Sequence, residues 1–303
     1  MNTSPNWVLI FLGGLLSATL SFSPALFHPA FILFSYLATL PLFLIGLSLG
    51  LYSLYGAALI ASVLVFIVEG ALAGSEFFVL SALGPIFLVN RALLNRKQKG
   101  KVIWYPSTYL LRDLTLASAI ITVIALGVYL YFSQGEDAQI FVNNFLKVFD
   151  PEGQLKDAKS ILYMLFPFLP GFFAFSWSVM MIINGTLAQG LLVRLHYNLR
   201  PSPTLGNLDA PDKLTLVLGL TLLLSLFGVG TLSLIGKNFT IIFFFPFFLI
   251  GLGIIHNWFH KTSFTTLGLT IFYFCLLFLF WPIFIVIFIG ILKPWIQKNN
   301  LTS

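Results

Sequence analysis

Two carboxylates flank a short run of small residues near the end of a long apolar segment. Glu69 and Glu76 enclose Gly70 to Gly74, and no Asp, Glu, Lys or Arg precedes Glu69 in the chain. An ionisable side chain beside hydrocarbon is costly and commonly marks a ligand or ion pathway. We interpret the pair as a candidate ligand-binding floor of an outward-facing cavity. The alternative is a pair of helix-end carboxylates that lie among lipid headgroups.

Two amide side chains lie inside another apolar run. Asn184 and Gln189 are five residues apart. An amide that leaves water needs a hydrogen-bond partner, and this partner is either a neighbouring helix or a ligand. The spacing does not put both side chains on one narrow helix face, so it favours two separate roles. Both remain candidate ligand-binding residues.

The same run leads into a basic segment that prolines terminate. Arg194 and Arg200 are followed by Pro201 and Pro203, which cannot continue a helix. Guanidinium groups bind phosphate or carboxylate in a bidentate way, so both arginines are candidate contacts for lipid or for a partner protein. The alternative is that they only orient the chain in its membrane, and both interpretations also apply to the basic residues of 91–101.

Patterns for enzymatic chemistry and for metal binding are missing from the sequence. His256 and His260 have a metal-binding spacing, but no third ligand is near and no glutamate follows the first histidine. There is no G-x-x-x-x-G-K phosphate-binding loop, and the G-x-S-x-G spacing of residues 46–50 lies in an apolar run rather than at a strand-to-helix turn. We therefore expect no enzymatic activity, no cofactor and no metal site.

The elements that carry these residues are predicted to lie in lipid. Hydrophobic residues make up 58% of the 303 residues and charged residues only 9%, against about 25% charged in ordinary globular proteins. The mean hydropathy is +0.98. A helix needs about 20 apolar residues to cross a bilayer, and the candidate runs are residues 7–22, 30–49, 51–68, 77–94, 109–132, 161–195, 214–235, 239–259 and 264–292. We predict an all-α bundle of eight or nine transmembrane helices, in a single integral membrane domain over residues 1–303.

One of these runs is too long for a straight crossing. Residues 161–195 would extend about 50 Å at 1.5 Å per residue. Pro167 and Pro170 are expected to kink this helix or to divide it.

Lysine and arginine predict which side of the membrane each loop faces. Lysine and arginine occur in the loop at 91–108, in the loop after the sixth run (Arg194, Arg200 and Lys213) and in the short loop at 256–261, which assigns these loops to the cytoplasm. The polar segment 133–160 then lies outside, and its apolar residues predict a surface helix near 140–149. Nine spans would place the N-terminus inside and the C-terminus outside. Because basic loops explain the net charge of +6, we expect no nucleic-acid partner.

Two segments resemble a known family. Residues 39–50 (TLPLFLIGLSLG) and residues 184–203, from Asn184-Gly-Thr-Leu-Ala-Gln189 to Arg200-Pro-Ser-Pro, resemble the YybS-like family of uncharacterised bacterial polytopic membrane proteins. That family is distantly similar to the substrate-binding components of energy-coupling-factor transporters. The resemblance implies a transporter-component-like core, an outward-facing pocket, and small residues on one helix face that contact a transmembrane coupling subunit. Gly14 and Ala18, or Ser17 and Ser21, could supply that face.

These observations predict a multi-pass protein of the bacterial inner membrane. It would bind or help translocate a small solute, with an energy-coupling partner, through the cavity beside Glu69 and Glu76. The alternative is a non-enzymatic scaffold or interaction protein of the cell envelope.

Overall fold

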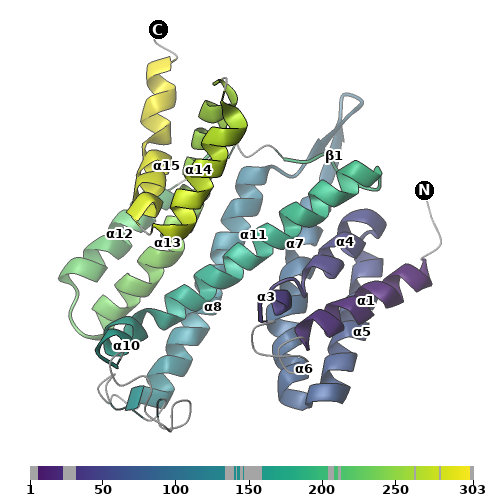
Figure 1. Ribbon diagram of the computed structural model, residues 1–303, viewed down its shortest axis with the longest axis horizontal. Helices are drawn as coiled ribbons and strands as arrows, with labels where there is room; N and C mark the ends of the chain where they lie inside the picture. Colours follow the sequence, from purple (N-terminus) through teal and green to yellow (C-terminus); the bar gives the residue numbers. More distant parts are fainter. Residues whose placement is uncertain are drawn as a thin grey trace. The chain divides into compact units, whose positions relative to one another are not determined.

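The computed structural model describes residues 6–22, 32–133, 140, 142–143, 146, 159–203, 208–210, 213–262, 264–279 and 281–300. These residues are mostly helical (Figure 1). Within this part of the chain, the helices long and apolar enough to cross a membrane are Leu51–Glu69, Ala71–Leu93, Ser107–Tyr131, Ser160–Leu195 and Thr231–His260, with a sixth if a bent pair counts as one span. Shorter apolar helices are Trp7–Ser21, Leu40–Leu49 and Leu214–Phe227. The all-α membrane class is confirmed, whereas a count of eight or nine spans stays a prediction.

The chain divides into two compact units, Met1–Leu110 with Trp177–Pro203, and Leu111–Ser176 with Thr204–Ser303. The first unit contains α1 (Trp7–Ser21), α3 (Ile32–Ser35), α4 (Leu40–Leu49), α5 (Leu51–Glu69), α6 (Ala71–Phe77), a π-helical turn (Phe78–Ala82), α7 (Leu83–Leu93), β1 (Asn95–Gln98) and β2 (Lys101–Trp104). The second contains α10 (Lys159–Leu165), a 3-10 turn (Phe166–Phe168), α12 (Leu214–Phe227), α13 (Thr231–His260), α14 (Thr265–Phe278) and α15 (Trp281–Asn300). Helices α8 (Ser107–Ser133) and α11 (Leu169–Leu195) contribute residues to both units.

Small residues of α1 allow it to pack closely on α5. A methyl group at Gly14 would lie 2.7 Å from the carbonyl oxygen of Ala57, and the Ser17 and Ala18 side chains are fully buried. Gly14, Ser17 and Ala18 are thus packed inside this unit, and the contact of this face with a coupling subunit stays a prediction.

A single glycine makes the turn between α5 and α6. Gly70 has φ +93°, a left-handed conformation that glycine adopts without a steric penalty. A methyl group at Gly74 would lie 2.7 Å from Cβ of Phe66, so the returning helix packs directly on α5. The close helix approach that this glycine spacing permits is thus present.

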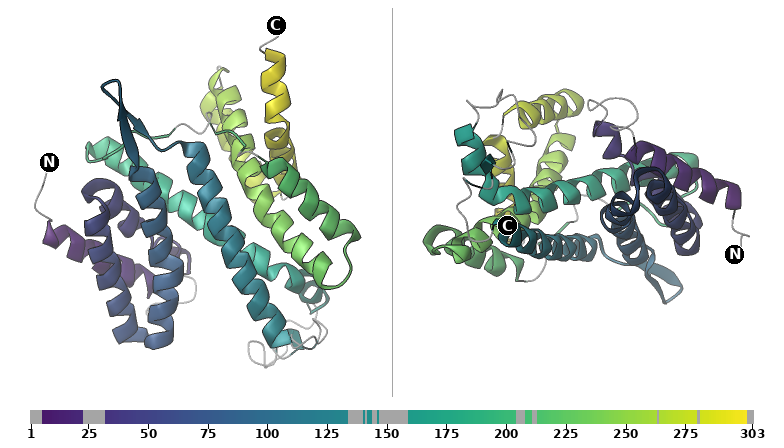
Figure 2. Two further views of the ribbon diagram at one scale, coloured as in Figure 1. Left: turned by 180° about the vertical axis from the view of Figure 1, so that it is seen from behind. Right: turned by 90° about the horizontal axis from the view of Figure 1, so that it is seen from below.

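The basic loop between α7 and α8 folds as a β-hairpin. Strands β1 and β2 are antiparallel, with Asn95 opposite Trp104 and Gln98 opposite Lys101. Lys99 and Gly100 connect them with φ of +49° and +77°, which is the type I′ geometry that matches strand twist. Both side views show the hairpin projecting beyond the helix ends of the first unit (Figures 1 and 2).

Proline divides the long apolar run 161–195, as the sequence predicted. Helix α10 ends at Leu165, a 3-10 turn with Pro167 follows, and α11 begins at Leu169 with Pro170 in its first turn. Since Pro167 and Pro170 have no N–H, they cannot donate the hydrogen bonds that a continuous helix would need.

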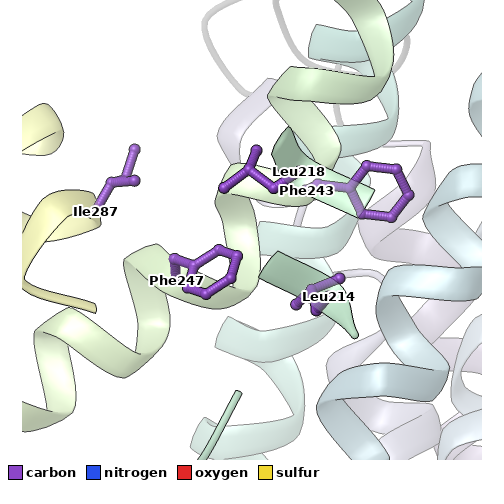
Figure 3. Close-up of a cluster of buried hydrophobic side chains, with 5 residues drawn as sticks. All are labelled: Leu214, Leu218, Phe243, Phe247 and Ile287. Carbon is purple, nitrogen blue, oxygen red and sulfur yellow. The ribbon is translucent and has the colours of Figure 1, made fainter. Parts of the chain in front are cut away.

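The core of the second unit lies where α12 and α15 meet α13. Figure 3 shows its buried side chains, Leu214, Leu218, Phe243, Phe247 and Ile287. Gly251 of α13 faces the carbonyl of Val286, and Gly290 of α15 faces the carbonyl of Phe247. This absence of side chains lets the two helix backbones touch.

The run 264–292 is bent, and its prediction as one crossing stays a prediction. The helix direction changes by 115° between Thr265–Leu276 and Trp281–Lys293, because Leu279 is extended and Pro282 starts the new helix. Lys293 then pairs with Asp209 at 2.9 Å and donates to the carbonyl of Leu208. Helix α15 thus ends beside the segment before α12, at the same end of this unit as the α13–α14 connection (Figure 1).

Most of segment 133–160 lies outside the described residues. Ile140, Val142, Asn143 and Leu146 are helical, and Asn143 accepts a hydrogen bond from the Tyr163 hydroxyl at 2.8 Å. The surface helix near 140–149 stays a prediction.

Candidate functional site

One polar feature inside the first unit is an interruption between α3 and α4, the Tyr36–Thr39 turn. Pro41 lacks an N–H, and the Leu37 carbonyl instead accepts from Leu40 N at 3.0 Å. The carbonyls of Tyr36 and Ala38 receive side-chain donors from two other helices, Asn184 of α11 at 2.7 Å and Ser17 of α1 at 2.6 Å. Irregular backbone at membrane depth is tolerated where it is buried in protein or lines a cavity.

Two buried oxygen atoms at this turn have no hydrogen-bond partner among the residues that the structure describes. The Asn184 amide nitrogen donates to the carbonyls of Tyr36 and Met180, but its Oδ1 accepts nothing. Thr39 is fully buried, and its Oγ1 is also unpartnered. A buried polar atom without a partner costs free energy and calls for a specific explanation, such as a bound ligand, water or ion.

Several hydroxyl groups in the apolar helices are satisfied locally. Thr115, Ser118 and Thr122 of α8 each donate to the carbonyl four residues earlier, at 2.8–2.9 Å. Thr39 makes no such bond and does not cap α4. Among the described residues, Thr39 shares its buried and unpartnered hydroxyl with Thr240 of α13, whereas these three hydroxyls of α8 are all paired.

The second unit contains a matched amide whose bonds are complete. Asn238 of α13 donates to the carbonyls of Pro167 and Leu234, both at 2.8 Å, and its Oδ1 accepts from Gly171 N at 2.7 Å. Asn238 and Asn184 thus serve equivalent helix interruptions and donate in the same way. They differ in Oδ1, which is occupied at Asn238 and free at Asn184.

Gln189 belongs to a different cluster, as its spacing from Asn184 predicted. Its amide nitrogen donates to the carbonyl of Arg200 at 2.8 Å and to the Ser202 hydroxyl at 3.3 Å. Asn198 donates to the same Arg200 carbonyl at 2.8 Å. These bonds fold the segment after α11 back onto that helix.

The Arg200 side chain is buried and connects this segment to the base of the β-hairpin. Its guanidinium donates to the carbonyls of Ala92 at 2.8 Å and Tyr105 at 3.3 Å, and lies 6.0 Å from the ring centre of Trp104. Burial lowers the pKa of Arg200, although a guanidinium stays protonated at physiological pH. Arg200 therefore clamps the residues that precede and follow the hairpin.

The other predicted residues belong to other segments of the chain. Glu69 and Glu76 are exposed beside the Gly70 turn, and their carboxylates bond to no described residue. Arg194 is exposed near the end of α11. His256 and His260 stack edge to face with ring centres 4.6 Å apart, and the described residues contain no group of three or more His, Cys, Asp or Glu side chains that could hold a metal.

Several polar contacts were missed in the sequence. Trp177 donates to the carbonyl of Leu80 at 2.7 Å, inside the π-helical turn, and Thr39 and Asn238 carry the contacts described above. Asn238 could have been found as an amide in an apolar run, the signal that identified Asn184. Nothing in the sequence distinguishes Thr39 from the other hydroxyls.

Apolar helices, a helix interruption buried among them and a basic hairpin between two candidate spans define a polytopic α-helical membrane protein. Residues 15–292 match the family described as "Predicted membrane protein (DUF2232)", and the chain belongs to that family. No curated protein and no solved structure significantly matches the chain.

Proposed function

We propose that the protein binds a small polar solute at the Tyr36–Thr39 turn and helps to move it across the bacterial inner membrane, without enzymatic chemistry. The free Oδ1 of Asn184 supports this proposal most directly. Its hydrogen-bonding equivalent in the second unit, Asn238 Oδ1, is occupied by a backbone N–H. The first unit thus keeps an acceptor that no donor of its described residues occupies.

The chemistry of the turn limits the kind of solute. Asn184 Oδ1 accepts a hydrogen bond, whereas the Thr39 hydroxyl can both donate and accept. Neither carries charge, so an uncharged solute with a hydrogen-bond donor fits better than a multivalent ion, which would be left without charge compensation in a low-dielectric site. In this proposal Glu69 and Glu76 mark the outward end of the solute's path, and an energy-coupling partner supplies the driving force.

The decisive variant is Thr39→Val, which removes the unpartnered hydroxyl at nearly constant shape. Without solute it should raise stability by about 1 kcal/mol, because an unsatisfied buried group is lost. Thr240→Val in α13 is the matched control, since Thr240 Oγ1 is also buried and unpartnered. Both variants should melt at higher temperature than the unaltered protein in detergent.

Stabilisation by added solute then distinguishes Thr39→Val from Thr240→Val. A panel of vitamins and other small uncharged polar solutes should contain one that stabilises the unaltered protein, by about 2.7 kcal/mol at one hundred times its Kd. That stabilisation should disappear in Thr39→Val and persist in Thr240→Val. Equal responses in both would reject this site, and a panel without any response would favour the envelope scaffold.

A further inference from the structure

We propose that the β-hairpin Asn95–Trp104 is a docking surface for anionic phospholipid headgroups. Arg96, Lys97, Lys99 and Lys101 are all exposed, and none of these four cations forms an ion pair with a described residue. No Asp or Glu occurs between Glu76 and Asp113. The hairpin is therefore a concentrated positive charge that nothing nearby in the sequence balances.

The hairpin also combines charge with apolar surface. Arg96 lies opposite Ile103 and Lys97 opposite Val102, and Ile103 and Val102 are 40% and 47% exposed. Since side chains on opposed residues share a face of the ribbon, each face pairs one of these cations with an apolar group. Basic and apolar groups side by side are typical of elements that bind at the boundary between headgroups and acyl chains.

Its position keeps these cations within electrostatic reach of a lipid surface. The hairpin connects two candidate spans, Ala71–Leu93 and Ser107–Tyr131. A four-residue strand rises about 14 Å, and the headgroup layer on one side of a bilayer is about 5–8 Å thick. The tip then lies within about one Debye length, roughly 8 Å, of that layer.

The clamp distinguishes this hairpin from a loop that serves only for orientation. Orientation by the positive-inside effect depends on lysine and arginine content and needs no defined fold. Here Arg200 fixes both ends through Ala92 and Tyr105, and Tyr105 N donates to the carbonyl of Leu94 at 2.9 Å. Burying a guanidinium group costs free energy. We infer that the contacts of Arg200 serve to fix the positions of the hairpin charges.

Native mass spectrometry of the full-length protein, titrated with phosphatidylglycerol or phosphatidylcholine, tests the proposal. The unaltered protein should bind phosphatidylglycerol more tightly. At about 1 kcal/mol, or fivefold, per cation, Lys97→Gln with Lys101→Gln should weaken phosphatidylglycerol binding about 25-fold. Phosphatidylcholine binding and melting temperature should not change.

Lys213→Gln with Lys261→Gln is the matched control, since both lysines are exposed and the same charge is removed. This double variant should change phosphatidylglycerol binding less than about twofold, because these two lysines are not held in one cluster as the hairpin cations are. An equal loss of phosphatidylglycerol binding in both double variants would show that net charge alone determines the affinity, and it would overturn the proposal. Unchanged lipid binding, with an acidic protein that co-purifies only when the hairpin lysines are present, would overturn it in favour of a protein partner.

Discussion

At the scale of single residues, the amides show how an apolar protein handles broken helices. Asn184 and Asn238 each donate once to the carbonyl four residues earlier and once to a carbonyl at an interruption. In water such carbonyls would be hydrated, but in lipid a protein donor must replace the water. A buried amide next to a proline-induced break is therefore a structural requirement before it is a functional one.

Asn238→Leu should destabilise the protein by about 2 kcal/mol. The variant removes three hydrogen bonds, and interhelical bonds in membranes contribute about 0.6 kcal/mol each. Unfolding in mixed micelles with increasing denaturing detergent would measure the change. Asn90→Leu is the control, because Asn90 is exposed on α7; a loss of the same size there would contradict the assignment of the cost to the Pro167 interruption.

The sequence predicted that Asn184 and Gln189 need partners in separate places, because helical periodicity alone decides that. It did not predict the partners. Tyr36 lies 148 residues from Asn184, and nothing local in either segment encodes that contact. Arg200 shows the same limit: a terminal arginine after a helix is a surface residue by default, and only tertiary folding reveals it as a buried clamp.

At the scale of elements, the basic segment between α7 and α8 was the least predictable. Its composition indicated a loop and a side of the membrane, whereas its fold is a two-stranded hairpin. An isolated two-stranded hairpin is only marginally stable in water. Its base must therefore be held by the rest of the first unit, and the Arg200 contacts supply that support.

Arg200→Gln should loosen the hairpin while leaving the helices folded. It removes the guanidinium bonds to Ala92 and Tyr105, and local opening then needs less free energy. Hydrogen exchange in detergent should show faster exchange at residues 95–104, with helix amides of α5 and α7 unchanged. Arg194→Gln, which replaces an exposed arginine on α11, should leave the hairpin protected; exchange that also rises in that variant would show that the clamp is not specific to Arg200.

At the scale of the whole molecule, composition was sufficient for the class of protein and for the positions of its long helices. Counting crossings was harder, because the sequence alone does not separate a straight span from a bent pair. The run 264–292 carries no charge, so nothing in it indicates where it enters or leaves the membrane. Only the Lys293 contacts with Asp209 and Leu208 reveal that its end returns to the segment before α12.

The contact of Lys293 with Asp209 changes the side of the membrane on which we expect the C-terminus. The α13 span has one end at the α12–α13 turn and the other at Lys261, so cysteines at Val229 and Lys261 report opposite sides. With Cys275 replaced by serine, a cysteine at Asn300 should react with a membrane-impermeant maleimide from the same side as the cysteine at Lys261. Because Lys293 pairs with Asp209, we expect α14 and α15 to enter and leave on one face, with Lys293 on the side where basic residues gather. Labelling of Asn300→Cys from the side of Val229→Cys would instead restore a full crossing by residues 264–292.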